Sequence, residues 1–505
     1  MSHARSSLLA PSRPALIALV MILLGLGLAI RVFDLSDLPL DYHPTRQLLS
    51  QLKARGMYYQ AHPELPDWQR KIAIQQWRTR VKIEPEVFER LVVFTYEFTG
   101  VNIAVARVYA SIFWLLSGVF IFLLVREYVS TDAALVSLAY FLFFPYDIIA
   151  SRSFQPDIPM LMLITCFWWS FSRWLRSPSW GWALLAGLAG GFAIFVKFVA
   201  VFFVIGAGAG MAIHAGVRAL LKKPQSWLIA ALGVLPSAAY LYYGMVVQGY
   251  LGQQFSGRFI PALLLNPFNY LQWSKMANLA AGGVAIAVGL LGVLLARNTG
   301  LRSLLMGLWI SYVLYGLFFD YHMGTHDYYQ LPLVAIVAVS FAPVTDSLME
   351  SASSVVRGGW ARAALLALFA YCVFNGLWTA RIQMSTVDYR PEAAMWSEIG
   401  DRLNHGPNVV ALSQDYGTRL AYWGWQDTIT WPGIIDAAYR EARGGSIGFD
   451  ELFAKLTLGN TYFLVTDFAE LERQPFLKQR LLDYQIYAQG AGYVIYDLER
   501  PVGAP

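Results

Sequence analysis

Long apolar runs separated by short polar connections occupy most of the first 380 residues of this chain. A helix that spans a bilayer needs about 20 predominantly apolar residues, and most of these runs approach that length. The pattern therefore predicts a polytopic α-helical membrane protein with about eleven transmembrane helices. The predicted spans are 14–32, 103–125, 132–150, 158–175, 181–196, 198–215, 226–248, 276–296, 302–319, 328–345 and 361–380.

The stretch 181–215 is too long for one span and short for two, so we expect a tight pair of helices with Lys197 at the bend. At 1.5 Å per residue from Trp182, Lys197 lies about 22 Å along its helix, near the edge of a ~30 Å hydrocarbon core. A lysine there can extend its ammonium to the interface. We favour a second interpretation, in which it neutralises a lipid phosphate.

Composition and charge support the membrane assignment. Hydrophobic residues make up 57% of the chain and charged residues 14%, whereas soluble domains carry roughly 25% charged residues. Arg5 and Arg13 precede the first span, which we interpret as a retained signal anchor with a cytoplasmic N-terminus. Lys and Arg then fall in the even-numbered connections, as the positive-inside rule predicts. The net charge of +5 is explained in this way, so no nucleic-acid partner is expected.

Three segments on the opposite, extracytoplasmic side are too long to be turns. In residues 34–100 we expect amphipathic helices at the membrane surface, and the second segment, around 250–274, carries Arg258. The third begins near residue 381, where the apolar runs 408–413, 461–466 and 493–498 indicate strands. We therefore divide the chain into a transmembrane catalytic domain, 1–380, which includes the loop 34–100, and a soluble extracytoplasmic α/β domain, 381–505.

A first polar cluster follows the first span. Asp41 there is a candidate general base, and His43 and Arg46 are candidate hydrogen-bond donors or anion ligands. The alternative is an interfacial loop that caps a surface helix starting near Thr45. The cluster reads Asp41-Tyr42-His43-Pro44-Thr45-Arg46-Gln47.

A second cluster, Ser151-Arg152-Ser153-Phe154-Gln155-Pro156-Asp157, lies between the third and fourth predicted spans. Pro156 ends any preceding helix and Asp157 would cap the next one, which alone explains a carboxylate. If Asp157 lies opposite Asp41 across a cleft, it gains a role in acceptor or metal binding.

A third cluster runs from Asp320 to Gln330. His322 and His326 have a spacing that suits a metal only in a helix, and Gly324 argues against one. We favour phosphate or sugar binding by His326, Tyr328 and Tyr329; the alternative is an aromatic interface belt. Because polar groups at membrane depth are costly and the topology places all three clusters on one face, we expect the chemistry there.

Several enzyme and scaffold classes are excluded. The chain has no Walker loop, no G-x-G-x-x-G after a strand and no H-E-x-x-H, so ATP-driven transport by this chain alone is not expected. Its two cysteines, Cys166 and Cys372, lie inside apolar runs, which excludes a disulfide scaffold and a thiolate zinc site.

Over about residues 14–345 the chain resembles the GT-C superfamily of integral-membrane glycosyltransferases, in the branch of the protein O-mannosyltransferases and the lipid A aminoarabinose transferase. Four features carry the resemblance: the acidic first loop, 41–47; the second carboxylate, in Gln155-Pro156-Asp157; a Gly-rich span from Gly187 to Gly191 that ends at Lys197; and His326-Asp327-Tyr328-Tyr329-Gln330-Leu331-Pro332, the most specific.

The resemblance implies a sugar donor on a polyprenyl phosphate, reached from the bilayer. Asp41 would take a proton from an acceptor hydroxyl, which attacks the anomeric carbon with inversion. Lys197 and His326 would stabilise the leaving phosphate, as would Arg258 by our inference from its loop position. Tyr328 and Tyr329 would contact the donor, and His43, Arg46 and Gln47 would support the first loop. Many relatives place two acidic residues at the first motif where this chain has only Asp41, so we predict no strictly required metal.

Two other functions compete with an inverting glycosyltransferase. A flippase or transporter of a lipid-linked sugar would show repeats and polar groups near the midplane, whereas here the polar groups gather at one face. An envelope scaffold would leave the three clusters unexplained. The acceptor is a protein, a lipid or a glycan. We expect a bacterial inner (plasma) membrane, because the motifs resemble bacterial relatives and no endoplasmic-reticulum retention signal is present.

Overall fold

The computed structural model describes residues 7–252, 259–355, 359–442, 445 and 447–503. Its chain forms two compact units that each combine separate segments. The first unit comprises Met1–Leu35, Val81–Phe88 and Ala104–Thr386, and the second comprises Ser36–Arg80, Glu89–Ile103 and Val387–Pro505.

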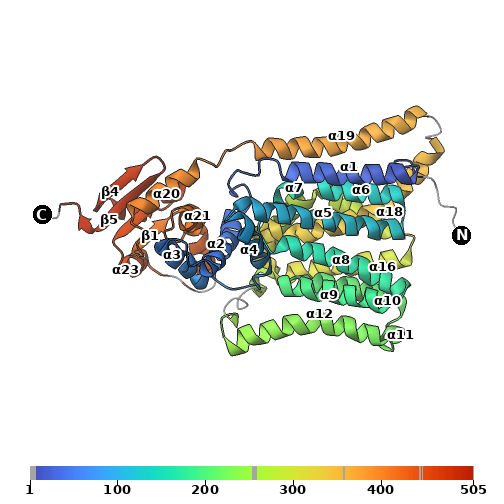
Figure 1. Ribbon diagram of the computed structural model, residues 1–505, viewed down its shortest axis with the longest axis horizontal. Coiled ribbons are helices and arrows are strands. Elements are labelled where there is room, and N and C mark those ends of the chain that lie inside the picture. Colours follow the sequence, from blue (N-terminus) through green and yellow to red (C-terminus); the bar gives the residue numbers. More distant parts are fainter. Residues whose placement is uncertain (1–6, 253–258, 356–358, 443–444, 446, 504–505) are drawn as a thin grey trace. The chain divides into compact units, whose positions relative to one another are not determined.

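The first unit is a bundle of apolar helices that run alongside one another, as Figure 1 shows. The second and third polar clusters of the sequence lie at the ends of these helices, whereas the first belongs to the second unit. The α-helices are α1 (Arg13–Arg31), α5 (Ile103–Tyr128), α6 (Thr131–Phe143), α7 (Pro145–Ala150), α8 (Asp157–Arg176), α9 (Trp180–Val196), α10 (Ala200–Ala215), α11 (Val217–Leu221), α12 (Pro224–Tyr242), α14 (Pro267–Ala281), α15 (Gly283–Leu295), α16 (Thr299–Phe318), α17 (Asp320–Thr325), α18 (Leu331–Val355) and α19 (Gly359–Met384). A π-helix, η1 (Tyr243–Val247), and two 3-10 helices, η2 (Pro261–Leu265) and η3 (Asp327–Gln330), complete the unit.

The length and hydropathy of these helices identify a helical membrane protein. Among the described residues, six helical stretches are long and apolar enough to span a bilayer, and the pair α14–α15, bent by 89°, makes a seventh if it is one span. Three shorter apolar helices, α6, α9 and α10, add to these. Every predicted span coincides with at least part of a helix, but about eleven crossings remains a prediction, because several of these helices are short.

The expected break at Lys197 is present. Helix α9 starts after Ser179, whose hydroxyl accepts the Trp182 N–H at 3.2 Å, and ends at Val196. Lys197 is its C-terminal cap in an extended conformation (φ −152°, ψ 116°), and α10 begins three residues later. The Gly-rich part of α9 packs tightly: a Cβ at Gly191 would lie 2.0 Å from the carbonyl oxygen of Leu232 in α12. The sequence therefore holds α9 close to α12 and turns the chain at the lysine.

The second unit combines three helices from the first long loop with a C-terminal α/β fold (Figure 1). Its α-helices are α2 (Pro44–Ala61), α3 (Asp67–Thr79), most of α4 (Val87–Thr99), α20 (Glu392–Arg402), α21 (Thr418–Trp423), α22 (Ile434–Ala442), α23 (Phe449–Thr457), α24 (Phe468–Glu472) and α25 (Pro475–Leu481). Its strands are β1 (Val409–Leu412), β2 (Ile429–Thr430), β3 (Tyr462–Val465), β4 (Tyr484–Gly490) and β5 (Tyr493–Pro501), with one 3-10 helix, η4 (Gln414–Gly417).

The five strands form one mixed sheet in the order β2-β1-β3-β5-β4. Strand β1 pairs in parallel with both β2 and β3, and β5 pairs antiparallel with both β3 and β4. All four residues of β1 are buried, as expected for a central parallel strand covered on both faces. One face packs against Trp396 of α20 and Leu420 of α21, and the other packs against Phe453 of α23 and Leu477 of α25.

The observed units differ from the division at residue 380 in the place of the first loop. Segments 36–80 and 89–103 group with the C-terminal residues, whereas the sequence placed the whole loop with the transmembrane helices. The reason is a shared apolar core, in which Leu48 and Leu52 of α2 pack with Ala421 and Tyr422 of α21. Such a contact joins segments more than 300 residues apart, so no local pattern encodes it.

Candidate functional site

A buried ion pair lies at the centre of the polar cluster in the first unit. The Lys197 ammonium nitrogen is 2.7 and 2.8 Å from the two carboxylate oxygens of Asp157. Asp157 is only 2% exposed and Lys197 only 5%. Asp157 is the first residue of α8, directly after the N-cap residue Pro156. Both carboxylate oxygens of Asp157 therefore bind the lysine ammonium.

Two tyrosines complete the surroundings of this ammonium. Its nitrogen lies 5.2 Å from the ring centroids of both Tyr328 and Tyr329, which is within the range of cation–π attraction. Tyr329 stacks in turn on Tyr315 of α16, with ring centroids 5.9 Å apart and an interplanar angle of 9°. The cation thus has a carboxylate and two aromatic rings around it.

The 3-10 helix that carries these tyrosines is fixed at its last residue. The Gln330 side-chain NH2 donates to the carbonyl oxygen of Met323 at 3.1 Å, and its side-chain oxygen accepts the hydroxyl of Tyr312 at 2.6 Å. The most specific sequence motif therefore contains its own anchor, and the anchor ties η3 to α16 and α17.

The two histidines of the third cluster lie beside this aromatic group. His322 and His326 have ring centroids 5.4 Å apart, and His322 stacks on Tyr329 at 5.0 Å. The Nδ1 atom of His326 lies 2.7 Å from the Thr325 hydroxyl oxygen. Within the described residues, no three His, Cys, Asp or Glu side chains gather as a metal site, so the histidine pair has no third ligand of these types there.

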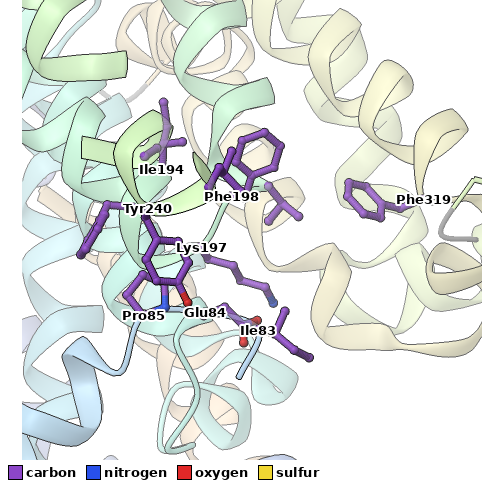
Figure 2. Close-up of a pocket in the computed structure, with 12 residues that line it drawn as sticks. Ile83, Glu84, Pro85, Ile194, Lys197, Phe198, Tyr240 and Phe319 are labelled. Atoms are coloured by element: carbon purple, nitrogen blue, oxygen red, sulfur yellow. The ribbon is translucent and has the colours of Figure 1, made fainter. Parts of the chain in front are cut away.

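Lys197 also lines a pocket that the sequence did not predict. Figure 2 shows this pocket, with Lys197 and Glu84 both in its wall. Apolar groups from α9, α12 and Phe319 make up most of the remaining lining. Glu84 lies in the stretch Lys82-Ile83-Glu84-Pro85-Glu86, which in sequence looks like an exposed charged linker. No periodicity or motif there signals a pocket residue; the proline only indicates an extended backbone before it.

The first-loop residues belong to the second unit and are described within it. Gln47 is buried, and its side-chain NH2 donates to the carbonyl oxygens of Tyr42 and Pro39. His43 has a left-handed backbone (φ 42°), with its ring edge-to-face on Tyr42 at 4.6 Å. Gln47 therefore holds the loop that carries Asp41.

Asp41 and Arg46 are partly buried at this loop, and Asp41 faces the C-terminal part of the unit. Burial raises the pKa of the nearby Tyr389 phenol, and the negative charges of Asp41 and Glu392 raise it further, whereas Arg419 lowers it. Asp41, the candidate base, therefore lies in an environment that it shares with Tyr389, Glu392 and Arg419. Arg258, the remaining candidate, lies outside the described residues.

Comparison with known proteins supplies a family match for part of the chain. Residues 84–243 match the family model of the dolichyl-phosphate-mannose-protein mannosyltransferases. This segment contains Glu84, Asp157 and Lys197. A comparison with curated protein sequences found no match.

Solved structures match over nearly the whole chain. ArnT from Cupriavidus metallidurans bound to undecaprenyl phosphate aligns with a TM-score of 0.55 at 14% identity, covering 94% of this chain and 97% of that one. The oligosaccharyltransferase of Archaeoglobus fulgidus in its apo form has a TM-score of 0.57 at 13% identity, covering 97% and 76%. The mycobacterial arabinofuranosyltransferase AftD has a TM-score of 0.53 at 14% identity, covering 98% of this chain and 40% of the other.

These likenesses span both units, whereas the family match lies almost entirely in the first. The predicted resemblance to the GT-C glycosyltransferases is therefore confirmed, by the mannosyltransferase family model for residues 84–243 and by the fold for the chain as a whole.

Proposed function

We propose that this protein is an inverting glycosyltransferase that moves a sugar from a polyprenyl-phosphate donor to an acceptor hydroxyl at the extracytoplasmic face of a bacterial inner membrane. The observation that carries the proposal is the buried Asp157–Lys197 pair beside Tyr328 and Tyr329. A lysine held in a membrane protein's apolar interior is expensive to bury. The presence of Lys197 in this apolar interior is explained if its ammonium binds an anion during the reaction.

The relatives support a polyprenyl-phosphate donor. The family model describes dolichyl-phosphate mannose as a donor, and the ArnT structure contains undecaprenyl phosphate. Both are long isoprenoid alcohols esterified to phosphate, so we propose a sugar phosphodiester of this lipid class for this chain. The sugar itself and the nature of the acceptor are left open among protein, lipid and glycan.

The proposed reaction is a single displacement. Asp41 accepts the proton of the acceptor hydroxyl as its oxygen attacks the anomeric carbon. The bond between that carbon and the phosphate oxygen breaks, and the electron pair leaves with the polyprenyl phosphate. The new glycosidic bond has the opposite anomeric configuration, and the products are the glycosylated acceptor and the lipid phosphate.

Lys197 supplies the positive charge for the leaving phosphate in this scheme, together with His326 and Arg258. Asp157 acts as a positioning residue rather than as a second base, because both of its oxygens already hold the ammonium. It keeps Lys197 charged and oriented inside an apolar bundle until a phosphate arrives. Because every step uses these side chains, the proposal requires no metal.

The deciding experiment compares the wild type with Asp41→Asn in membranes that hold equal amounts of folded protein. Transfer is measured from a radiolabelled pool of polyprenyl-phosphate sugars, and movement of the same donors between leaflets is measured in parallel. Loss of transfer in Asp41→Asn supports the proposed base. Undiminished transfer removes Asp41 from this role, and leaflet movement without transfer in either protein identifies a flippase instead.

A further inference from the structure

The sheet of the second unit has a topological switch point between β1 and β3. The connection from β1 to β2 runs through α21, whose Leu420 packs on the same face as Trp396. The connection that leaves β3 runs through α24 and α25, whose Leu471 and Leu477 pack on the opposite face. Adjacent parallel strands whose connections leave to opposite faces open a crevice beyond their carboxyl ends, which is where ligands bind in open α/β sheets.

The segment that follows β1 at this point has an unusual backbone. Asp415 (φ 52°) and Tyr416 (φ 56°) are consecutive non-glycine residues in the left-handed region. Bulky residues rarely adopt this conformation. Tyr416 is 54% exposed, and its hydroxyl donates to the Asp436 carboxylate at 3.0 Å. The chain thus holds an aromatic ring on the surface at the switch point.

Polar side chains follow each of the three parallel strands. After β1, Gln414 exchanges two hydrogen bonds with Thr466, which follows β3, at 2.9 and 2.7 Å. After β2, Asp436 accepts from the Gly433 N–H at 3.3 Å. Gln414 and Thr466 therefore orient each other, and Asp436 is held by the Gly433 N–H and the Tyr416 hydroxyl.

One arginine organises the carboxylates next to the ring. The guanidinium of Arg419 donates to Asp415 and to Glu392, at 2.6 Å in each case. The carboxylates named at this edge, Asp415, Asp436 and Glu392, outnumber the single Arg419. An anionic ligand would meet net repulsion there, whereas the hydroxyls of a neutral sugar can donate to the carboxylates and accept from the guanidinium. An exposed aromatic ring offers such a sugar an apolar face to pack against.

The same edge is continuous with the first loop. The Thr45 hydroxyl donates to the Asp415 carboxylate at 3.3 Å, and Thr45 lies four residues after Asp41. Asp41 and Arg419 both act on the charge environment of Tyr389. A molecule bound at the switch point therefore lies in the same unit as the proposed base and beside its loop.

We propose that the carboxyl edge of β1 and β3 binds a neutral saccharide, which is the acceptor of the reaction. Tyr416 provides the packing surface, and Asp415, Arg419 and Asp436 provide the hydrogen bonds. The saccharide-binding site is inferred from the geometry of the second unit alone. Its role as the acceptor site rests on the proposed function.

The test measures binding without any donor. Full-length protein in nanodiscs is mixed with mannotriose, galactotriose and maltotriose, and saturation-transfer NMR reports contact. A Ser/Thr-containing peptide and glucose 6-phosphate serve as comparison probes. Tyr416→Gly removes the ring while favouring the left-handed backbone, so it does not threaten the fold. Tyr487→Ala, which removes a 45% exposed tyrosine on the far strand β4, is the matched control.

We expect saturation transfer to at least one trisaccharide, weakened about tenfold or more by Tyr416→Gly and unchanged by Tyr487→Ala. Binding of the peptide or of the sugar phosphate in place of the neutral sugars overturns the proposal, as does equal binding by Tyr416→Gly. The outcomes separate the two claims. A chain that transfers sugar but binds no saccharide contradicts the acceptor site alone, and one that binds saccharide but transfers none contradicts the transferase.

Discussion

Both carboxylate oxygens of Asp157 lie within 2.8 Å of the Lys197 ammonium, and the pair is nearly inaccessible to solvent. Removing one member leaves a buried charge without its partner, which costs about 3–5 kcal/mol in folded proteins. Replacing both members by neutral groups avoids that penalty. Single and double substitutions at this pair can therefore distinguish a structural role of the two side chains from a chemical one.

We expect Asp157→Asn and Lys197→Met each to lower the unfolding temperature in detergent, and the double variant to recover most of the loss. The double variant should nevertheless transfer no sugar, because it lacks Lys197, the side chain proposed to bind the donor phosphate. A double variant as unstable as the worse single one would show that the two side chains are not coupled.

Glu84 shares a pocket wall with Lys197. If Lys197 binds the donor phosphate as proposed, the Glu84 carboxylate competes with that phosphate for the positive charge. Glu84→Gln is expected to lower the KM for the lipid donor several-fold, since unit charges a few ångströms apart interact by about 1–4 kcal/mol in partly hydrated surroundings. Steady-state kinetics with a varied donor tests this. The exposed Glu64, changed to Gln, should leave the donor KM unchanged. A raised KM in Glu84→Gln would mean that the carboxylate binds the donor rather than competing with it.

Gly191 permits the close approach of α9 and α12. A Cβ there would lie 2.0 Å from the carbonyl oxygen of Leu232, whereas nothing lies within 4 Å of a Cβ at Gly181 in the same helix. Gly191→Ala should lower the amount and the unfolding temperature of the purified protein. The reason is that the backbone of Leu232 cannot move aside as the end of a flexible side chain can. Gly181→Ala should be neutral or slightly stabilising, by about 0.5–1 kcal/mol. Equal behaviour of the two variants would contradict tight packing at Gly191.

Arg55 joins the first-loop helices to the C-terminal part of the second unit. Its guanidinium donates to Gln76 at 2.7 Å and to the Ala421 carbonyl oxygen at 3.0 Å, and its Cζ lies 3.8 Å from the Trp425 ring centroid. Lysine lacks the planar fork that makes these contacts together, so Arg55→Lys should cost roughly 2–3 kcal/mol. Arg78→Lys, at an exposed hydrogen bond to Gln60, is the matched control.

The Arg55 contribution should not vary across neutral pH. Burial lowers the pKa of Arg55 to about 10, so the group stays protonated in the folded unit up to about pH 9. Above that range the unfolded chain binds more protons than the folded one, and this group's effect on stability becomes more favourable as pH rises. Chemical unfolding of the wild type and of Arg55→Met, which has no titratable group at this position, measures the difference at several pH values. A gap between them that changes between pH 6 and 9 would contradict this assignment.

Hydropathy was sufficient for the helices, because an apolar run of span length has few alternatives to a helix in a bilayer. The break at Lys197 was also predictable, since 181–215 could not be a single span. Strands β1, β3 and β5 were recognised from apolar runs. Strand β2 has only two residues and β4 is mostly exposed, so neither shows a hydrophobic pattern.

The site was predicted as separate residues and not as contacts. Asp157 was expected to cap a helix or to take part in acceptor or metal binding, and the structure gives it Lys197, 40 residues later, as a partner. Asp157 and Lys197 can each be recognised as a candidate site residue from the sequence. That they contact each other depends on the packing of α8 against α9. Glu84 was missed because its role depends on which helices enclose it, and that is long-range information.

The second unit is assembled from both ends of the chain, and this has a consequence for biosynthesis. Leu48 and Leu52 pack on Ala421 and Tyr422, yet roughly 280 residues of membrane helices are made between the two segments of this unit. At about 5–20 residues per second, the early segment waits roughly 15–60 s for its partner helix α21. During that interval the apolar face of α2 has no native partner on the nascent chain, so this face is exposed to aggregation until the C-terminal residues are made.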